Sequence, residues 1–231
     1  MKRVYKTVAT HPVDGGWGVA LDGRPLRTPG KSALVLPKEA LAAAIAAEWN
    51  AQQDEIRPAT MPLFRLAATA IDRTPPQRDL VVAETANYAG TDLVCYRADH
   101  PPALAARQHA EWQKLIDWAS LRYDTALVVT AGILPARQPP ATLSTFTAIV
   151  AAQDEFRLTA LHTLTACCGS LVIALALLEG RLGADSAFAA SQLDETFQIE
   201  AWGEDAEATA RRQALAADIA AAARFLALLD A

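Results

Sequence analysis

Residues 158–178 read LTALHTLTACCGSLVIALALL and contain no charged side chain. A helix of about 20 apolar residues is long enough to cross a bilayer. However, threonines and a histidine recur in the first half of this stretch, and Gly169-Ser170 stands at its centre. Charged residues crowd both flanks, and the other expected helices are amphipathic. We therefore expect a helix buried within a bundle of helices, and no membrane insertion; a membrane-associated scaffold is the competing hypothesis.

The composition is that of a globular protein with a substantial core. The chain has 231 residues, of which 52% are hydrophobic, and a net charge of −5. This length allows one large domain or two small ones. No basic patch is present, so we expect no nucleic acid partner. The cysteines, Cys95, Cys167 and Cys168, are odd in number and lack CxxC spacing, which argues against disulfides and zinc and fits a reducing, cytoplasmic setting.

The first 36 residues have the pattern of antiparallel strands. Residues 4–9 and 33–36 are short strand candidates, and apolar residues alternate along 17–21. Asp22-Gly23 follows, a pair typical of a type I′ hairpin turn because both central residues need positive φ. This turn would place Leu26 opposite Val19 on the return strand. We predict an antiparallel β-meander of three or four strands.

The remainder of the chain is predicted to be mainly helical. Pro37 suits the first position of a helix, where its missing N–H is no loss. The expected helices span 37–53, 61–74, 76–87, 103–123, 142–152, 158–178, 186–202 and 204–229. The predicted fold class is α+β, with a β-rich domain and its first helix in residues 1–56 and a helical domain in residues 57–231.

Residues with catalytic or metal-binding chemistry do not form a recognisable motif. No two histidines are spaced i, i+4, and HExxH does not occur, so we expect no metal site. The glycine-rich segment 14–18 lies in a predicted hairpin, whereas a phosphate loop would need a helix to follow it. Cys167 and Cys168 lie in an apolar helix, where a thiol is inert. We expect neither a cofactor nor an enzyme.

The segment 190–203, ASQLDETFQIEAWG, is unusual because a helix would give it two distinct stripes. An inward stripe would contain Ala190, Leu193, Phe197 and Ala201. A second stripe would join a carboxylate, an amide and an indole through Ser191, Glu195, Gln198 and Trp202. Spacing alone favours a solvated helix face that ends with the tryptophan packed against the next helix, since charged faces are usually only solvated. By the same argument Trp49 is expected in the core, and Glu48 is expected to be a surface charge.

The chain resembles the family of assembly chaperones that act on the α subunit of the F-type ATP synthase catalytic sector, the Atp-twelve type. The specific matches are LDGRPLRTP at 21–29 and the LDETFQ…WG segment at 193–203. Weaker matches follow in order over nearly the whole chain, at Tyr5-Lys6, Leu36-Pro37, Glu48-Trp49, Gln52 or Gln53, Met61-Pro62, Thr91-Asp92, Cys95-Tyr96-Arg97, Gln108, Trp112 and Gly169-Ser170-Leu171.

The resemblance implies a chaperone without a catalytic centre that shields the free α subunit until the β subunit replaces it. The family's acidic determinant maps onto Glu195. The expected partner-binding residues are Glu195, Asp194, Gln198 and Glu200. The residues expected to have a structural role are Trp49, Asp22, Gly23 and Trp202.

Eukaryotic members carry a mitochondrial presequence, whereas this chain starts directly at the expected fold. The resemblance therefore implies a bacterial-type, cytoplasmic member, and we expect a monomer. The alternative function is a small-molecule-binding protein or enzyme that uses a pocket between the two domains.

Overall fold

The computed structural model describes residues 2–132 and 136–231. An N-terminal antiparallel sheet precedes a mainly helical remainder, so the predicted α+β class is confirmed. The chain forms two compact units. Unit 1 comprises Met1–Arg78, Asp154–Ala160 and Ala221–Ala231, and unit 2 comprises Asp79–Gln153 and Leu161–Ala220. The expected division at residue 56 stays a prediction.

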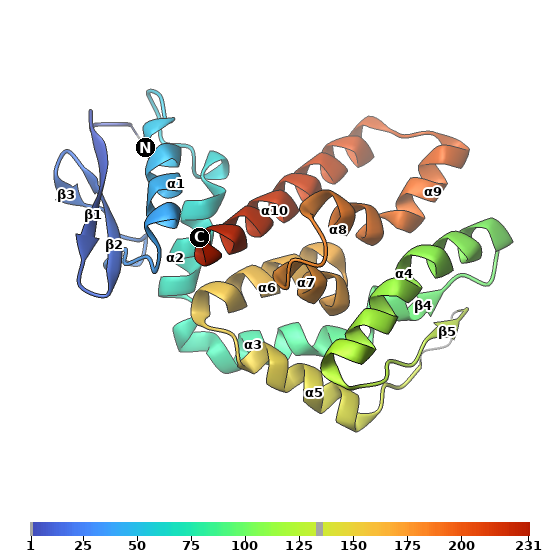
Figure 1. Ribbon diagram of the computed structural model, residues 1–231. Helices are drawn as coiled ribbons and strands as arrows, with labels where there is room; N and C mark the ends of the chain where they lie inside the picture. The colour runs from blue at the N-terminus through green and yellow to red at the C-terminus, as the bar shows by residue number, and fades with distance from the viewer. Residues whose placement is uncertain (1, 133–135) are drawn as a thin grey trace. The chain divides into compact units, whose positions relative to one another are not determined.

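The sheet of unit 1 has the order β1-β2-β3, with antiparallel pairing throughout (Figure 1). Its strands are β1 (Val8–Val13), β2 (Gly16–Leu21) and β3 (Arg24–Pro25). The first strand begins at Val8, four residues later than the apolar pattern predicted. The expected strand at 33–36 is reduced to isolated bridges, in which Leu36 pairs with Trp17 and Ala33 with Arg27. The three-stranded meander is otherwise as predicted.

The turn between β2 and β3 has the predicted left-handed backbone, with φ 48° at Asp22 and 76° at Gly23. The amide of Leu26 donates to the carbonyl of Val19 at 2.8 Å, as the hairpin register requires. The Asp22 carboxylate also accepts hydrogen bonds from the backbone amides of Thr7, at 2.8 Å, and Lys6, at 3.0 Å. These bonds favour the ionised form and lower the pKa of Asp22. The turn residue therefore fixes the segment that leads into β1.

Helices α1 (Glu39–Asn50) and α2 (Pro62–Asp72) form the helical part of unit 1 beside the sheet (Figure 1). Trp49 is buried, with its ring 5.1 Å from that of Phe64, and its carbonyl accepts the Tyr5 hydroxyl at 2.6 Å. Its neighbour Glu48 is not the expected surface charge. The Glu48 carboxylate accepts the backbone amides of Leu63 and Phe64, each at 2.8 Å. It thus satisfies unpaired donors in the first turn of α2, while burial raises its pKa.

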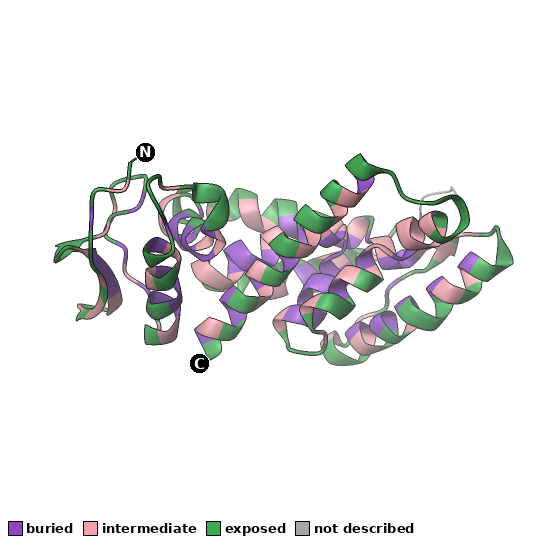
Figure 2. Ribbon diagram, turned by 90° about the horizontal axis from the view of Figure 1, so that it is seen from above, coloured by how far each residue is buried: buried purple, intermediate pink, exposed green. Residues whose placement is uncertain are grey.

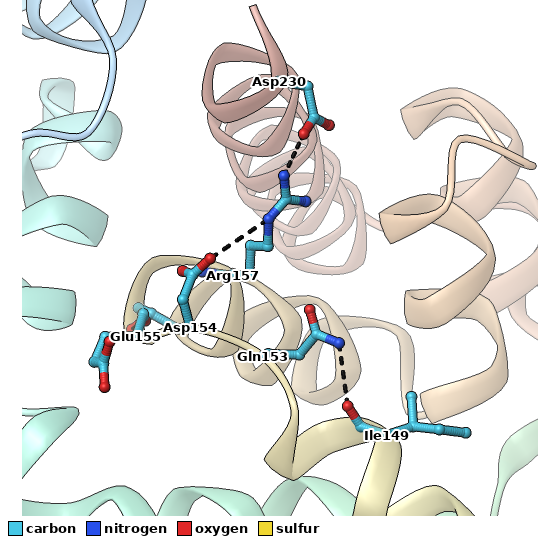
Figure 3. A network of polar contacts seen from close by, with 7 residues as sticks. Ile149, Gln153, Asp154, Glu155, Arg157 and Asp230 are labelled. Carbon is cyan, nitrogen blue, oxygen red and sulfur yellow. Dashed lines mark hydrogen bonds and ion pairs between the residues drawn. The ribbon is translucent and has the colours of Figure 1, made fainter.

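Two further segments of unit 1 come from later in the chain, the first turn of α6 (Glu155–Cys168) and the last turns of α10 (Ala206–Asp230). Arg157 lies between two carboxylates, 3.5 Å from that of Asp154 and hydrogen-bonded to that of Asp230 (Figure 3). The buried hydroxyls of Thr74 and Thr159 are 2.7 Å apart. The ion pair of Arg157 with Asp230 connects α6 with α10, and the threonine contact connects α6 with the segment that follows α2.

Unit 2 is mainly helical. Besides most of α6 and α10 it holds α3 (Arg78–Asn87), α4 (Pro102–Tyr123), α5 (Pro140–Ala151), α7 (Leu171–Leu178), α8 (Ala184–Ser191) and α9 (Leu193–Trp202). A short parallel pair, β4 (Tyr96–Arg97) and β5 (Thr130–Ala131), completes it. Single 3-10 turns span Pro58–Thr60 and Pro75–Gln77 in unit 1 and Tyr88–Gly90 and Leu93–Cys95 in unit 2. Helix α7 contacts α4 and α8 and forms the centre of this unit (Figure 1).

The central apolar stretch was predicted to be one helix. It forms two, α6 and α7. Gly169 has φ 63°, a conformation that ends α6, and the Ser170 hydroxyl then accepts the amide of Ile173 at 3.0 Å as the N-cap of α7. Residues 171–177 are between 0% and 6% exposed, so the expected burial is confirmed for this part of the stretch, whereas Leu178 is half-buried and Ala166 is exposed. Buried residues, coloured purple in Figure 2, occur in the helices as well as in the sheet. None of the described helices has both the length and the apolar character needed to cross a membrane.

The predicted helix at 186–202 is also divided. Helix α8 ends at Ser191, whose hydroxyl donates to the Phe188 carbonyl at 2.9 Å, and α9 begins at Leu193. Gln192 lies between them with φ −108° and ψ 22°, outside the helical region. The helical phase is therefore reset just before the segment that carries Glu195.

Candidate functional site

A fully buried carboxylate joins two of the matched sequence segments. Asp92 accepts hydrogen bonds from the Ser170 hydroxyl at 2.5 Å, the Val172 amide at 3.0 Å and the Val94 amide at 3.2 Å. Burial raises the pKa of Asp92 to about 6, although these hydrogen bonds act in the opposite direction. All of its partners belong to the break between α6 and α7 or to the loop before β4. Asp92 thus positions helix α7, and its buried carboxylate is not available to bind another protein.

A second network connects α4 with the start of α9. The Gln108 side chain accepts the amide of Ala98 at 2.7 Å and donates to the Asp194 carboxylate at 2.7 Å. One helical turn further along α4, the Trp112 indole N–H donates to the carbonyl of Ala190 at 2.9 Å. Asp194, expected at the partner-binding surface, is therefore engaged by its own chain.

The last turn of α9 is connected to α4 as well. The Glu200 carboxylate forms an ion pair with the Arg107 guanidinium at 2.7 Å, and this hydrogen bond lowers the pKa of Glu200. Sequence reasoning did not single out Arg107, because the two residues are 93 positions apart and no local pattern relates them. Two of the four expected partner-binding residues are thus committed to contacts within unit 2.

Glu195 differs from both of its acidic neighbours. It was expected to be exposed, but it is half-buried. Among residues 2–132 and 136–231, no side chain or backbone group forms a hydrogen bond or ion pair with its carboxylate. Gln198, one turn further on, is exposed. The predicted inward stripe is buried only at Leu193, since Ala190 and Phe197 are half-buried and Ala201 is exposed. Glu195 and Gln198 are consequently the two expected binding residues whose side chains form no hydrogen bond or ion pair within the described part of the chain.

Trp202 does not have the structural role that the sequence suggested. Its side chain was expected to pack against the following helix, yet the residue is 82% exposed. Helix α9 ends at Trp202, and Gly203, with φ 86° and ψ 170°, leads the chain away in an extended conformation. The exposed indole lies two helical turns from Glu195 on the same helix. By contrast Trp49, Asp22 and Gly23 make the structural contacts described above.

A hollow of about 530 Å³ is lined by residues of α4, α8 and the first turn of α9. Its lining combines apolar side chains, among them Leu115, Leu182 and Leu193, with three cations and one acid, namely Arg107, Lys114, Arg181 and Glu111. Glu195 does not line this hollow. In the part of the chain that the structure describes, no three His, Cys, Asp or Glu side chains gather in a metal-binding arrangement.

The ATP12 chaperone protein family matches residues 2–120 of the sequence. The chain belongs to this family. It is 26% identical over 214 residues to the protein atp12, mitochondrial, of Schizosaccharomyces pombe, covering 87% of this chain and 74% of the relative. The crystal structure of Atp12 from Paracoccus denitrificans superposes with a TM-score of 0.95 at 47% identity, over 99% of this chain and 98% of the other. The Atu1473 protein of Agrobacterium tumefaciens gives 0.94 at 40% identity, over 99% and 86%.

Membership of the ATP12 family makes the chain an assembly chaperone and not an enzyme. The relevant question for such a protein is which surface holds the partner. In unit 2, the side chains of Asp92 and Gln108 are engaged in internal hydrogen bonds, whereas the Glu195, Gln198 and Trp202 side chains of α9 form no hydrogen bond or ion pair with the described residues. This face of α9 is the candidate functional site.

Proposed function

We propose that this ATP synthase assembly chaperone binds the free α subunit of the F-type catalytic sector and hands it on for assembly with the β subunit. We further propose that it does so as a cytoplasmic monomer. The observation that carries the proposal is the Glu195 carboxylate, which is half-buried yet has no partner among the described residues. A charge held partly away from water gains most from a partner that brings the opposite charge.

The neighbouring residues support this assignment by contrast. Asp194 and Glu200 bind Gln108 and Arg107 and thereby orient α9. Their geometry makes them positioning residues, while Glu195 and Gln198 are left to make contacts with the α subunit.

The chemistry of such a surface suits a chaperone. An unassembled subunit exposes an apolar interface larger than a free protein tolerates, so the chaperone needs to cover it. The chaperone also has to release its client, and a polar surface of moderate affinity serves that purpose better than a dry one. A charge at the rim mainly sets the rate and orientation of encounter.

The direct test is copurification of the tagged chain with the α subunit of the same organism, followed by titration with three variants. Glu195→Lys is expected to weaken binding by tenfold or more, and the defect should vary with ionic strength. Glu195→Gln retains size and hydrogen bonding, so its defect should be smaller. Glu84→Lys is the control for the same change of charge, because Glu84 is an exposed glutamate of unit 2 that lies on α3.

Melting temperatures of the same variants separate recognition from folding. All three should melt close to the wild type, since surface substitutions change stability by about 0.5 kcal/mol or less. Unchanged binding by Glu195→Lys would end the claim that this carboxylate recognises the client. A large loss of melting temperature in Glu195→Gln would instead assign the residue to the fold.

A further inference from the structure

The exposed indole of Trp202 stands apart from the other tryptophans of the chain. Trp112 and Trp49 are buried, and Trp17 and Trp118 are half-buried, whereas Trp202 is 82% exposed. A tryptophan presents a large apolar surface to water when it is exposed in this way. Tryptophan is also among the residues most enriched at the energetic centres of protein interfaces. Covering this indole in a complex would therefore be energetically favourable.

Trp202 and Glu195 form one continuous surface on α9. The spacing i, i+3, i+7 places Glu195, Gln198 and Trp202 on the same face of a helix. Seven residues of helix separate the backbone positions of the first and last by about 10 Å. Both ends of the helix are connected to α4 through Asp194 and Glu200, which keeps this spacing fixed.

The charges around the indole define the occupant. The chain continues past Trp202 with Glu204, Asp205 and Glu207. Glu204 lies 3.7 Å from Arg212, and the Asp205 carboxylate accepts the amide of Ala208 at 2.8 Å. Glu207 is exposed and, like Glu195, has no partner in the described part of the chain. Residues 194–207 thus contain six acidic and no basic side chains, so the chain on both sides of Trp202 carries negative charge, which is complementary to a cation.

We propose that Trp202 is the aromatic anchor of the client-binding surface, and that the occupant is a basic segment of the client. One arginine or lysine of that segment stacks on the Trp202 indole, and a second, about 10 Å away, pairs with Glu195. This inference rests on the proposed function, because the client is taken to be the α subunit. It extends that function by naming the anchor and the charge of the surface that the anchor meets.

Substitutions at Trp202 test the anchor and its chemistry through the affinity for the α subunit. Trp202→Ala is expected to weaken binding by tenfold or more. Trp202→Phe should stay within about threefold of the wild type because the ring still attracts a cation, and Trp202→Leu should bind almost as weakly as alanine. Leu121→Ala is the matched control, since Leu121 is 88% exposed in unit 2 but lies on α4.

Two results of this series would overturn the proposal. Binding by Trp202→Ala within twofold of the wild type would show that the indole is not an anchor. Wild-type binding by Trp202→Leu would show that the contact is merely apolar and that the occupant need not be basic. Trp202 has few contacts to lose, so all variants should keep the wild-type melting temperature and circular dichroism spectrum.

A spectroscopic measurement follows the indole directly. The chaperone is labelled with 5-fluorotryptophan, and the Trp202 resonance is assigned by its absence from the Trp202→Phe spectrum. Adding unlabelled α subunit is expected to shift this resonance and to reduce its solvent isotope effect between H2O and D2O. A complex that co-elutes in gel filtration while the Trp202 resonance stays unchanged would overturn this inference and leave the proposed function intact.

Two other outcomes separate the remaining alternatives. If no complex forms with the α subunit, the proposed function fails, and this inference fails with it. If the Trp202 resonance shifts with chaperone concentration alone, the surface is occupied by a second copy of the chain, for which the hollow lined by α4, α8 and the first turn of α9 is a suitable receptor. That result would also overturn the proposal.

Discussion

Asp92 and Glu195 are both acidic residues in the sequence segments on which the resemblance was based, yet their surroundings in unit 2 are opposite. Asp92 is fully buried and surrounded by hydrogen-bond donors from the start of α7 and the loop before β4. Glu195 is half-buried and has no donor within the described chain. A shared motif therefore does not reveal by itself whether a carboxylate holds the fold together or is reserved for a partner; the satisfaction of its hydrogen bonds does.

The same contrast occurs between adjacent residues of α9. Asp194 is fixed by Gln108, while the next residue, Glu195, points to no partner. Four predictions test whether the buried core around Asp92 and α7 determines stability while the exposed face of α9 determines binding to the α subunit.

The largest effect on stability is expected for Leu175→Asp in the buried helix α7. Leu175 is 0% exposed in the middle of α7, and an unpaired charge there costs several kcal/mol, on the order of the whole stability of a domain. We expect no soluble, folded protein on expression. Leu178→Asp is the control at the half-buried end of the same helix, and it should remain partly soluble. A normally folded Leu175→Asp variant would show that this face is not a core.

The next effect is expected for Asp92→Ala, which should lower the free energy of unfolding by about 2–3 kcal/mol because buried donors lose their acceptor. Chemical denaturation measures this change. The affinity of the folded fraction for the α subunit should remain that of the wild type, since Asp92 lies away from the surface. A selective loss of binding without a loss of stability would break the distinction between the two regions.

The pH dependence of stability gives a third test. The pKa of Asp92 is about 6 in the folded chain and near the ordinary aspartate value of 3.8 in the unfolded chain, so the folded state binds more protons between these values. Stability should therefore fall as pH rises from about 4 to 6. The difference from Asp92→Asn, which does not titrate, isolates this contribution, which is on the order of 3 kcal/mol. An identical pH profile for both proteins would contradict the raised pKa.

The smallest effects are expected at adjacent positions of α9. Asp194→Ala should lower stability by about 1 kcal/mol through the lost bond with Gln108. Glu195→Ala should change stability by less than about 0.5 kcal/mol but weaken binding to the α subunit. Thermal melts and binding titrations on both variants check this. Equal stability losses at the two positions would mean that Glu195 has an internal partner after all.

The parts of the fold that depend on neighbouring residues were predictable from the sequence. Asp22-Gly23 specifies its turn through positive φ at consecutive positions, and the apolar run of α7 specifies burial. The break at Gly169-Ser170 was missed because the length of the apolar run outweighed a glycine and a serine. What stabilises that break is Asp92, which is 78 residues away from Ser170 and is connected with it by no local pattern.

The candidate site was predictable only in part for a related reason. Assigning Ser191 and Glu195 to one stripe assumed a continuous helix, whereas the non-helical residue Gln192 shifts the phase between them. Ser191 is consequently buried in α8. The exposure of Trp202 depends on the direction that the chain takes at Gly203, after the end of α9. The helical periodicity of the sequence gives no information about that direction. The ion pair of Glu200 with Arg107 requires knowledge of which helices are neighbours.

The two connections of α9 to α4 have a consequence for the thermodynamics of client capture. The bond from Gln108 to Asp194 restrains the first turn, and the ion pair from Arg107 to Glu200 restrains the last. A helix restrained at both ends before the client arrives gives up little conformational entropy when it binds. Calorimetry should therefore find a less unfavourable binding entropy for the intact chain than for a double variant that lacks both connections, even if the enthalpies are alike.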